Sequence, residues 1–254
     1  MRIELLSPRE RDLLRDACRA AAATLAVVTR RIVAGVTTGD IDRWVREDTR
    51  RRGGLPSQLG YKGFPAAVCT SKNEVVCHGI PSAKDTLKRG DIVNVDVTTM
   101  LAGFHGDTST TVAVGPVSKE ANHVRDVARR CRDAGIAEVR PGARLGDIGA
   151  AIEALAAREG CSVVREYGGH GIGRAMHAEP HVPHWGRRGE GLRLRPGMAI
   201  TIEPMINLGG PAVRLLDDDW TVVTADGSLS AQFEHTVFVT DDGCEVMTRT
   251  RDNS

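Results

Sequence analysis

The chain has 254 residues, of which 41% are hydrophobic, and a formal net charge of +1. This length allows one large domain or two small ones, and the near-neutral charge argues against a general nucleic-acid or membrane-surface binder. No apolar run approaches the roughly 20 residues of a membrane-spanning helix, and the six cysteines form no CxxC pair. We therefore expect a globular protein of the reducing cytoplasm, with no specific DNA binding.

Two pairs of helices are predicted along the chain, each followed by strand-like runs. Ser7-Pro8 is a favourable helix start, because an N-cap residue precedes a proline in the first turn. Gly53-Gly54 and Gly160 are stop signals. The predicted helices are residues 8–34, 40–52, 118–139 and 146–159.

An internal repeat relates the two helix pairs. AGVTTGDI at 34–41 matches PGARLGDI at 141–148, and LKRGDIVNVDV at 87–97 overlays LRPGMAITIEP at 194–204, both at an offset of 107 residues. Several features that share one offset indicate a duplication. We expect one domain, residues 1–254, made of two pseudo-symmetric helix-helix-strand halves at approximately 8–114 and 115–246.

Each half carries an acidic residue in an otherwise apolar strand. Asp96 lies within the run 92–97, and Glu203 is its counterpart under the repeat. Because strand side chains alternate, Asp96 shares a face with Asn94 and Thr98, while the valines face the other way. A buried, unpaired carboxylate costs several kcal/mol, so something must neutralise each of these side chains.

Two further carboxylates, Asp107 and Glu234, lie in the strand-like runs that follow. The turn before Phe104 is short enough to make Asp96 and Asp107 hairpin neighbours. If the halves fold face to face, all four carboxylates converge and repel one another unless cations are present. Two divalent ions would offset their charge, which predicts a dinuclear hydrolytic centre with metals about 3.5–4 Å apart. Carboxylates with histidine suit manganese, iron, cobalt or catalytic zinc.

Histidines are concentrated in one glycine-rich segment, residues 168–185. A single loop histidine is more often a surface residue than a ligand, so only their combination with the carboxylates and the repeat favours a metal site. The candidates are His78, His170, His177, His181 and His184.

Five motifs in order resemble the signature of type I methionine aminopeptidases over nearly the whole chain. They are GYKGFPAAVCTSKNEVVCHGIP, VNVDVTTMLAGFHGDTSTT, GGHGIGRAMHAEPHV, ITIEPM and SAQFEHTV. The resemblance implies an α+β "pita-bread" fold, a curved antiparallel sheet with the helix pairs on its outer face. It also implies a metal-dependent hydrolase that removes the N-terminal methionine from nascent proteins when the second residue is small.

The resemblance further implies five ligands for two divalent ions, whose identity (Co, Mn, Fe or Zn) the sequence leaves open. Asp96 would chelate one ion, His170 and Glu203 would complete the other, and Asp107 and Glu234 would bridge the pair. The free α-amine of the substrate would bind one metal, which confines cleavage to the first residue.

Catalytic and substrate-binding roles follow from the same resemblance. Glu203 would also shuttle the proton, His177 would donate a hydrogen bond to the carbonyl oxygen, and His78 would contact the scissile amide nitrogen. The wall of the methionine pocket would be Tyr61, Phe64, Cys69, Met176 and Trp220. A sodium or potassium ion would bind the backbone oxygens of Asn73, Val75 and Ser230.

Three positions depart from the familiar bacterial pattern. Phe64 stands where tyrosine is common, Met176 where phenylalanine is common, and Gln58 where cysteine is often found. These changes keep a preference for methionine, because apolar and sulfur-containing walls suit a thioether. They leave open the tolerance for the second residue and for inhibitors.

Two alternatives share the fold. Proline-specific aminopeptidases keep the five ligands but normally add an N-terminal domain, for which a first helix at residue 8 leaves no room. A catalytically silent relative would have lost ligands, and all five are present. Type II enzymes carry a long insertion between His177 and Glu203, which are only 26 residues apart here. We expect a monomer acting on peptides and nascent chains, and docking of the arginine-bearing segment 2–15 on the ribosome is left open.

Overall fold

The structure is a computed structural model that describes residues 3–249 of the chain. The helices are α1 (Pro8–Thr29), α2 (Thr38–Arg51), the short 3₁₀ helix η1 (Tyr61–Gly63), α3 (Lys119–Ala137) and α4 (Leu145–Arg158). The strands up to α3 are β1 (Leu55–Pro56), β2 (Cys69–Lys72), β3 (Val75–Cys77), β4 (Ile92–Leu101) and β5 (Phe104–Ala113). The later strands are β6 (Ser162–Val163), β7 (Gly169–Gly171), β8 (Ala178–Val182), β9 (Ala199–Ile202), β10 (Met205–Asn207), β11 (Val213–Leu215), β12 (Val222–Thr224), β13 (Ser230–Gln232), β14 (His235–Val239) and β15 (Cys244–Val246).

Helix α1 begins where the sequence predicts and ends earlier. The Ser7 hydroxyl oxygen accepts from the Glu10 amide, and the Glu10 carboxylate accepts from the Ser7 amide, which forms a capping box. The predicted end at residue 34 is wrong, since the helix stops at Thr29. Gly35 takes a positive φ of 95° and donates its amide to the Leu87 carbonyl, so the chain has already turned toward the sheet.

The duplication is visible in the backbone. Helices α2 and α4 begin and end at the same offset of 107 residues, and the isolated bridges Thr37–Thr86 and Arg144–Arg193 are related by that offset too. The Gly35–Leu87 hydrogen bond recurs between Gly142 and Leu194. The two halves are therefore built by the same local interactions.

Strands β4 and β5 form a long antiparallel hairpin that carries two of the predicted site residues. Asp96 lies opposite Ser109 and Thr98 lies opposite Asp107, so both aspartates project from one face of the sheet. The strand continues to Leu101, further than predicted, and the turn is only Ala102-Gly103, both at positive φ.

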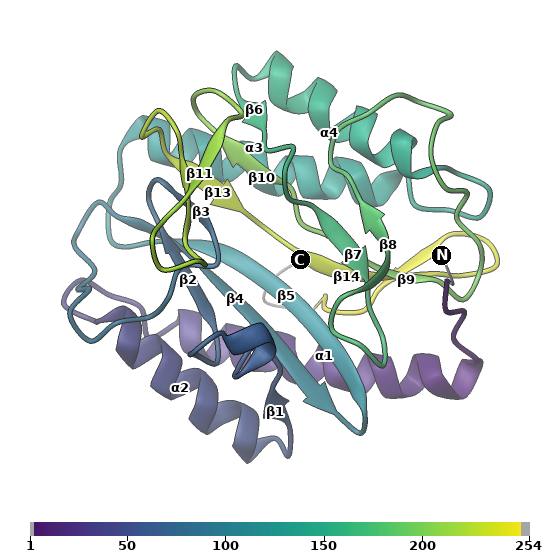
Figure 1. The fold of residues 1–254 in the computed structure, drawn as a ribbon, viewed down its shortest axis with the longest axis horizontal. Helices are drawn as coiled ribbons and strands as arrows, with labels where there is room; N and C mark the ends of the chain where they lie inside the picture. Colours follow the sequence, from purple (N-terminus) through teal and green to yellow (C-terminus); the bar gives the residue numbers. More distant parts are fainter. Residues whose placement is uncertain (1–2, 250–254) are drawn as a thin grey trace.

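The two helix pairs cover the outer side of the sheets, with α1 and α2 on one half and α3 and α4 on the other (Figure 1). All strand pairs in the described chain are antiparallel. One apolar core lies under α1 and α2 and includes Val93, Val95 and Val97 of β4. A second lies under α3 and α4. Helices with antiparallel sheets confirm the predicted α+β class.

The halves are joined where the candidate site lies. The Thr236 hydroxyl accepts from the Asp107 amide at 3.2 Å and donates to the Asp107 carbonyl at 2.8 Å. The Glu234 amide donates to the Ser109 carbonyl at 3.1 Å. These bonds connect β5 to β14 and to Glu234, the residue just before it, so Asp107 and Glu234 are held near each other by the backbone around them.

Gly106 allows α1 to pack directly on β5 beside Asp107. A Cβ atom at this position would lie 2.3 Å from the Cys18 amide nitrogen and 2.4 Å from the Cys18 Cα. Only glycine permits so close a backbone approach. The contact fixes the height of α1 above the strand that carries Asp107.

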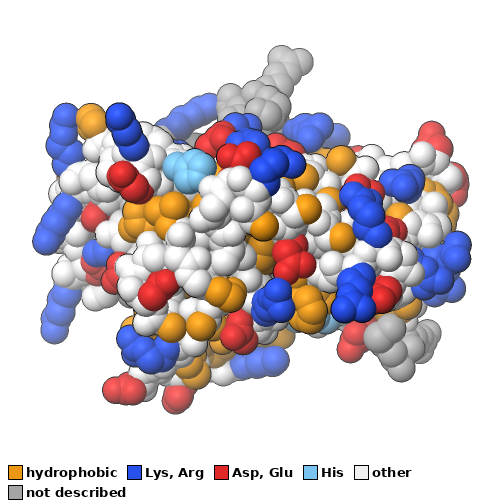
Figure 2. Space-filling model, turned by 90° about the horizontal axis from the view of Figure 1, so that it is seen from above, with side chains coloured by type: hydrophobic (Ala, Val, Ile, Leu, Met, Phe, Trp, Pro, Cys, Tyr) orange, Lys and Arg blue, Asp and Glu red, His pale blue; other side chains and the backbone are white. Residues whose placement is uncertain are grey.

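Basic, acidic and apolar side chains are interspersed on the face shown in Figure 2. This mixture fits the near-neutral net charge and shows no large single-sign surface on that face. Among residues 3–249, no helix combines the length and apolar character needed to cross a bilayer.

Candidate active site

Three carboxylates form the centre of the site. Asp96 from β4, Asp107 from β5 and Glu234 from the link between β13 and β14 each place one oxygen within 4.8 Å of the others. Asp96 Oδ1 and Glu234 Oε1 are buried and have no hydrogen-bond partner in the described chain. Buried oxygens that face one another without donors are the acceptor set that a cation satisfies.

Two more predicted residues complete the cluster from the second half. His170 Nε2 lies 3.5 Å from Glu203 Oε1 and 3.8 Å from Asp107 Oδ2. Glu203 and Glu234 were expected within strands, but β9 ends at Ile202 and β14 begins at His235. Pro204 accounts for the first difference, since proline has no amide to extend the ladder.

Neighbouring side chains orient these groups. The Thr98 hydroxyl donates to Asp107 at 2.8 Å, and the Thr201 hydroxyl donates to Glu203 at 2.7 Å. His170 Nδ1 lies 3.1 Å from the Gly171 carbonyl, so Nδ1 carries the ring proton and Nε2 presents its lone pair to the carboxylates.

Sequence reasoning did not assign roles to these orienting residues. Gln232 Nε2 donates to Glu203 at 3.0 Å, and His184 Nε2 accepts from the Glu203 amide at 3.1 Å. Thr98, Thr201 and Gln232 each lie two positions from a predicted ligand, which on a strand means the same face. This alternation of side chains along a strand could have identified the three residues from the sequence.

Burial and mutual repulsion dominate the electrostatics of the cluster. Burial, reinforced by the charge of Asp107, raises the pKa of Asp96 and of Glu234 well above their usual values. Burial raises the pKa of Asp107 to about 6, and burial with repulsion from Asp107 raises that of Glu203 to about 8. Burial lowers the pKa of His170 to about 3, which keeps its imidazole neutral. The protein alone therefore does not stabilise four ionised carboxylates.

The residues present fit a divalent metal centre. Four carboxylates and a neutral imidazole provide hard and borderline ligands, and the orphaned oxygens of Asp96 and Glu234 point to missing positive charge. No cysteine belongs to the cluster of described ligand atoms. Oxygen-rich sites of this kind are catalytic more often than structural.

A pocket of about 170 Å³ opens onto the cluster. The rings of Phe64 and Trp220 meet edge to face with centroids 5.0 Å apart, and Met176 is 5% exposed in the wall. The lining residues are Gln58, Tyr61, Lys62, Phe64, Cys69, His78, Asp96, Thr98, Asp107, His170, Met176, His177, Glu203, Trp220 and Glu234. The structure thus brings together all of the side chains that were predicted for catalysis, for the methionine pocket and for divalent metals.

Two histidines lie at the pocket apart from the carboxylates. His177 Nδ1 is 2.8 Å from the Tyr61 hydroxyl, and its ring meets that of His170 at 4.2 Å. His78 lies between Tyr167 and Trp220, with ring centroids at 5.7 and 6.2 Å. Both imidazoles are neutral at pH 7, because burial lowers the pKa of each, to about 4 for His177. A neutral imidazole can donate through one nitrogen while the other accepts.

The other predicted positions lie outside the pocket. His181 is exposed on β8. Asn73 and Ser230 lie together, since the Ser230 amide donates to the Asn73 carbonyl at 2.9 Å, and Val75 begins the adjacent β3. Of the segment 2–15, Arg2 lies outside the described residues.

The site combines a carboxylate cluster that fits divalent cations, neutral hydrogen-bond donors and a small apolar pocket. These features together are typical of a metal-dependent hydrolase. Residues 12–241 match the family described as Metallopeptidase family M24. The chain belongs to this metallopeptidase family.

Within that family, its close relatives are methionine aminopeptidases. The chain is 50% identical to methionine aminopeptidase A of Synechocystis sp. (strain ATCC 27184 / PCC 6803 / Kazusa), covering 97% of each, and 45% identical to that of Escherichia coli (strain K12), covering 100% of this chain and 97% of the relative. The crystal structure of methionine aminopeptidase from Rickettsia prowazekii is 46% identical, with a TM-score of 0.96 over 98% of this chain and 100% of that one.

A proline-specific relative is more distant. The prolidase from Pyrococcus furiosus is 18% identical, with a TM-score of 0.78 over 97% of this chain and 66% of the prolidase. That likeness shows the common fold only. The family match and the methionine aminopeptidases of 45–50% identity confirm the family resemblance and the pita-bread fold expected from the sequence.

Proposed function

We propose that this metallopeptidase removes the N-terminal methionine from peptides and nascent chains whose second residue is small. The observation that carries the proposal is the meeting of five potential metal ligands with a pocket lined by Phe64, Cys69, Met176 and Trp220. An apolar, sulfur-containing and aromatic wall suits an unbranched thioether side chain. The methionine aminopeptidases that share 45–50% of its sequence support the same activity.

We assign Asp96, Asp107, His170, Glu203 and Glu234 as ligands for two divalent ions, with Mn, Fe, Co or Zn as candidates. Asp107 is within 4.8 Å of the ligand oxygens of Asp96 and Glu234 and 3.8 Å from His170 Nε2, which suits a bridging position, and the family resemblance assigns Glu234 the same role. When bound, such ions neutralise the carboxylates, lower the pKa of water and polarise the substrate carbonyl.

The chain's own residues divide the remaining work. Glu203, beside the cluster and held by Thr201, is placed to carry a proton between water and the leaving amine. His177 receives support from the Tyr61 hydroxyl at Nδ1 and donates through Nε2 to the carbonyl oxygen as charge develops there. His78, fixed between two aromatic rings, contacts the scissile amide nitrogen.

Further assignments complete the proposal. The chain acts as one catalytic domain of two halves, residues 8–114 and 115–246, and as a monomer in the cytoplasm. The backbone oxygens of Asn73, Val75 and Ser230 hold a sodium or potassium ion. The segment at residues 2–15 is the candidate contact with the ribosome.

Peptide hydrolysis by the metal-loaded chain tests the activity. Met-Ala-Ser should release methionine, Met-Leu-Ser should react much more slowly, and Ala-Pro-Ala should remain intact. Cleavage of Ala-Pro-Ala without release of methionine from Met-Ala-Ser would transfer the assignment to the proline-specific relatives. No cleavage of either peptide at full metal occupancy would favour a silent binding protein.

A further inference from the structure

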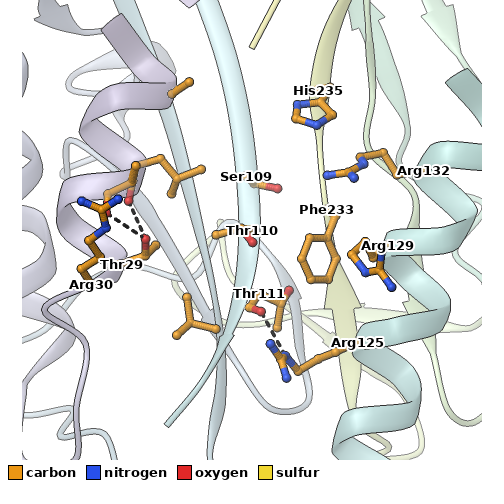
Figure 3. Close-up of a pocket in the computed structure, with 14 residues that line it drawn as sticks. Thr29, Arg30, Ser109, Thr110, Thr111, Arg125, Arg129, Arg132, Phe233 and His235 are labelled. Atoms are coloured by element: carbon orange, nitrogen blue, oxygen red, sulfur yellow. Dashed lines mark hydrogen bonds between the residues drawn. The ribbon is translucent and has the colours of Figure 1, made fainter. Parts of the chain in front are cut away.

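A second and larger cavity, of about 430 Å³, lies behind the candidate active site. Phe233 and His235 line it, while Glu234 between them lines the active-site pocket, so the two hollows occupy opposite sides of one strand segment. Helix α1 forms one wall and α3 the other, with β5 between them (Figure 3). The volume is within the range of small-molecule sites.

The described side chains that line this cavity carry charge of one sign. Four arginines line it, and no aspartate or glutamate of the described chain does: Arg30, Arg125, Arg129 and Arg132. Arg129 and Arg132 donate to Asp126 and Asp133 at 2.7 Å, but these carboxylates lie outside the lining.

Arg125 differs from Arg129 and Arg132 because the oxygens that accept its hydrogen bonds are neutral. It donates to two neutral oxygens, the Thr111 carbonyl at 3.0 Å and Asn122 Oδ1 at 3.4 Å. Burial lowers the pKa of Arg125 and of Arg132 below the usual value, as expected for cations with little contact with water.

Two buried side chains lie at the inner end of the cavity, and one of them has a ring nitrogen without a partner in the described chain. Arg132 is 6% exposed, and Figure 3 shows it extending from α3 toward Phe233 and His235. His235 is 1% exposed, and its Nε2 has no hydrogen-bond partner in residues 3–249. A buried polar atom without a partner calls for a ligand or an ordered water.

The hydrogen bonding of His235 leaves its Nε2 available to a partner in the cavity. Its Nδ1 lies 2.8 Å from the Thr248 hydroxyl, which also accepts from the Thr236 amide at 3.2 Å. The Thr248 hydroxyl can donate to Nδ1, and in that tautomer the ring proton is on Nε2. The inner end then presents an N–H beside a guanidinium, a pair of donors suited to an anion.

We propose that this cavity binds a small phosphate-bearing anion. Arginine guanidinium groups match phosphate oxygens with paired, charge-assisted hydrogen bonds. Ser109 and Thr110 of β5 add hydroxyl groups, and the ring of Phe233 with Leu25 of α1 offers an apolar wall for the body of an organic phosphate. The inference is independent of the proposed peptidase activity.

Calorimetric titration of the metal-loaded chain with inorganic phosphate, pyrophosphate and AMP tests the proposal. The double variant Arg125→Gln/Arg129→Gln should weaken binding at least tenfold, because it removes two guanidinium groups from the cavity. Arg130→Gln/Arg158→Gln is the matched control, since it removes the same charge from positions outside the lining and should keep the wild-type affinity. Neither double variant changes a residue of the active-site pocket, so any binding of the anions there contributes equally to both titrations.

The lysine variant Arg125→Lys/Arg129→Lys keeps the charge and covers the case in which the glutamine variant fails to fold. It should still lose several-fold in affinity, because an ammonium cannot form the paired contact. Tighter binding of AMP than of phosphate supports an organic phosphate, and equal binding supports the inorganic anion. Equal weakening in the cavity and control variants, or no binding of any probe up to about 1 mM, overturns the proposal.

Discussion

At the residue scale, His177 lies in the pocket wall and is not one of the proposed metal ligands. We therefore expect it to act on the substrate and not on metal binding. Its Nδ1 contacts Tyr61, so one ring nitrogen remains for the substrate. His177→Ala should lower kcat roughly a hundredfold or more, as expected for the loss of one transition-state donor, with metal content unchanged. Enzyme kinetics and metal analysis of the same preparation measure both quantities.

His181→Ala is the matched control, because this histidine is exposed on β8 and should leave both quantities at wild-type values. A parallel loss of metal and activity in His177→Ala would instead make His177 a ligand.

Met176 is one of three departures from the bacterial pattern, all of which line the pocket. A flexible thioether side chain repacks where a phenyl ring is rigid. Met176→Phe should therefore sharpen selection against bulky second residues, raising the Met-Ala over Met-Val ratio of kcat/KM several-fold, about 1 kcal/mol. The rate on Met-Ala peptides should change little. Met176→Leu is the control, and identical ratios in all three enzymes would show that residue 176 only fills space.

At the scale of elements, the contact of α1 with β5 depends on Gly106. Its missing Cβ would meet the backbone of Cys18, which cannot move without displacing the helix. Gly106→Ala should lower the free energy of unfolding by about 1–3 kcal/mol or more and weaken metal binding through the adjacent Asp107. Gly243→Ala, where nothing lies within 4 Å of the added atom, should be neutral. Equal urea-unfolding midpoints for the two variants would refute this account of the packing.

Asp48 links the first helix pair through a buried carboxylate. It accepts from the Thr24 hydroxyl at 2.9 Å and from Arg52 Nε at 2.6 Å. Burial alone would raise its pKa, but the hydrogen bonds from Arg52 and Thr24 outweigh burial and hold the pKa below its usual range. The stabilisation is thus present above the unfolded pKa of about 3.9 and is lost as pH falls through the lower folded value.

Asp48→Asn should therefore lower the free energy of unfolding by about 1–3 kcal/mol at pH 7, and the deficit should shrink below pH about 4. Chemical unfolding at several pH values measures the difference. Asp241→Asn, on the exposed surface, is the control. A deficit that stays constant down to pH 3 would mean that the carboxylate charge is not involved.

At the scale of the whole molecule, the duplication made much of the fold predictable. Helix stop signals placed α2 and α4 to within two residues, and the offset of 107 residues paired Asp96 with Glu203. Strand alternation placed Asp96 and Asp107 on one face, as the hairpin confirms. These features follow from local periodicity, which a sequence displays directly.

Other features depend on contacts between distant segments and could not be predicted. The position of Glu234 is set by the hydrogen bond from its amide to the carbonyl of Ser109, 125 residues earlier in the chain. The arginine-lined cavity exists only because α1 and α3, from different halves, stand on either side of β5. Nothing in the local sequence of either helix indicates that the two meet.

The rate of methionine release from Met-Ala-Ser tests the central claim most directly. The chain should be inactive after removal of metal with a chelator and regain activity with Mn²⁺. Asp107→Asn, which alters the carboxylate at the centre of the cluster, should remain at least a hundredfold slower at the same Mn²⁺ concentration. Methionine release by the metal-free chain, or a wild-type rate in Asp107→Asn, would contradict the account.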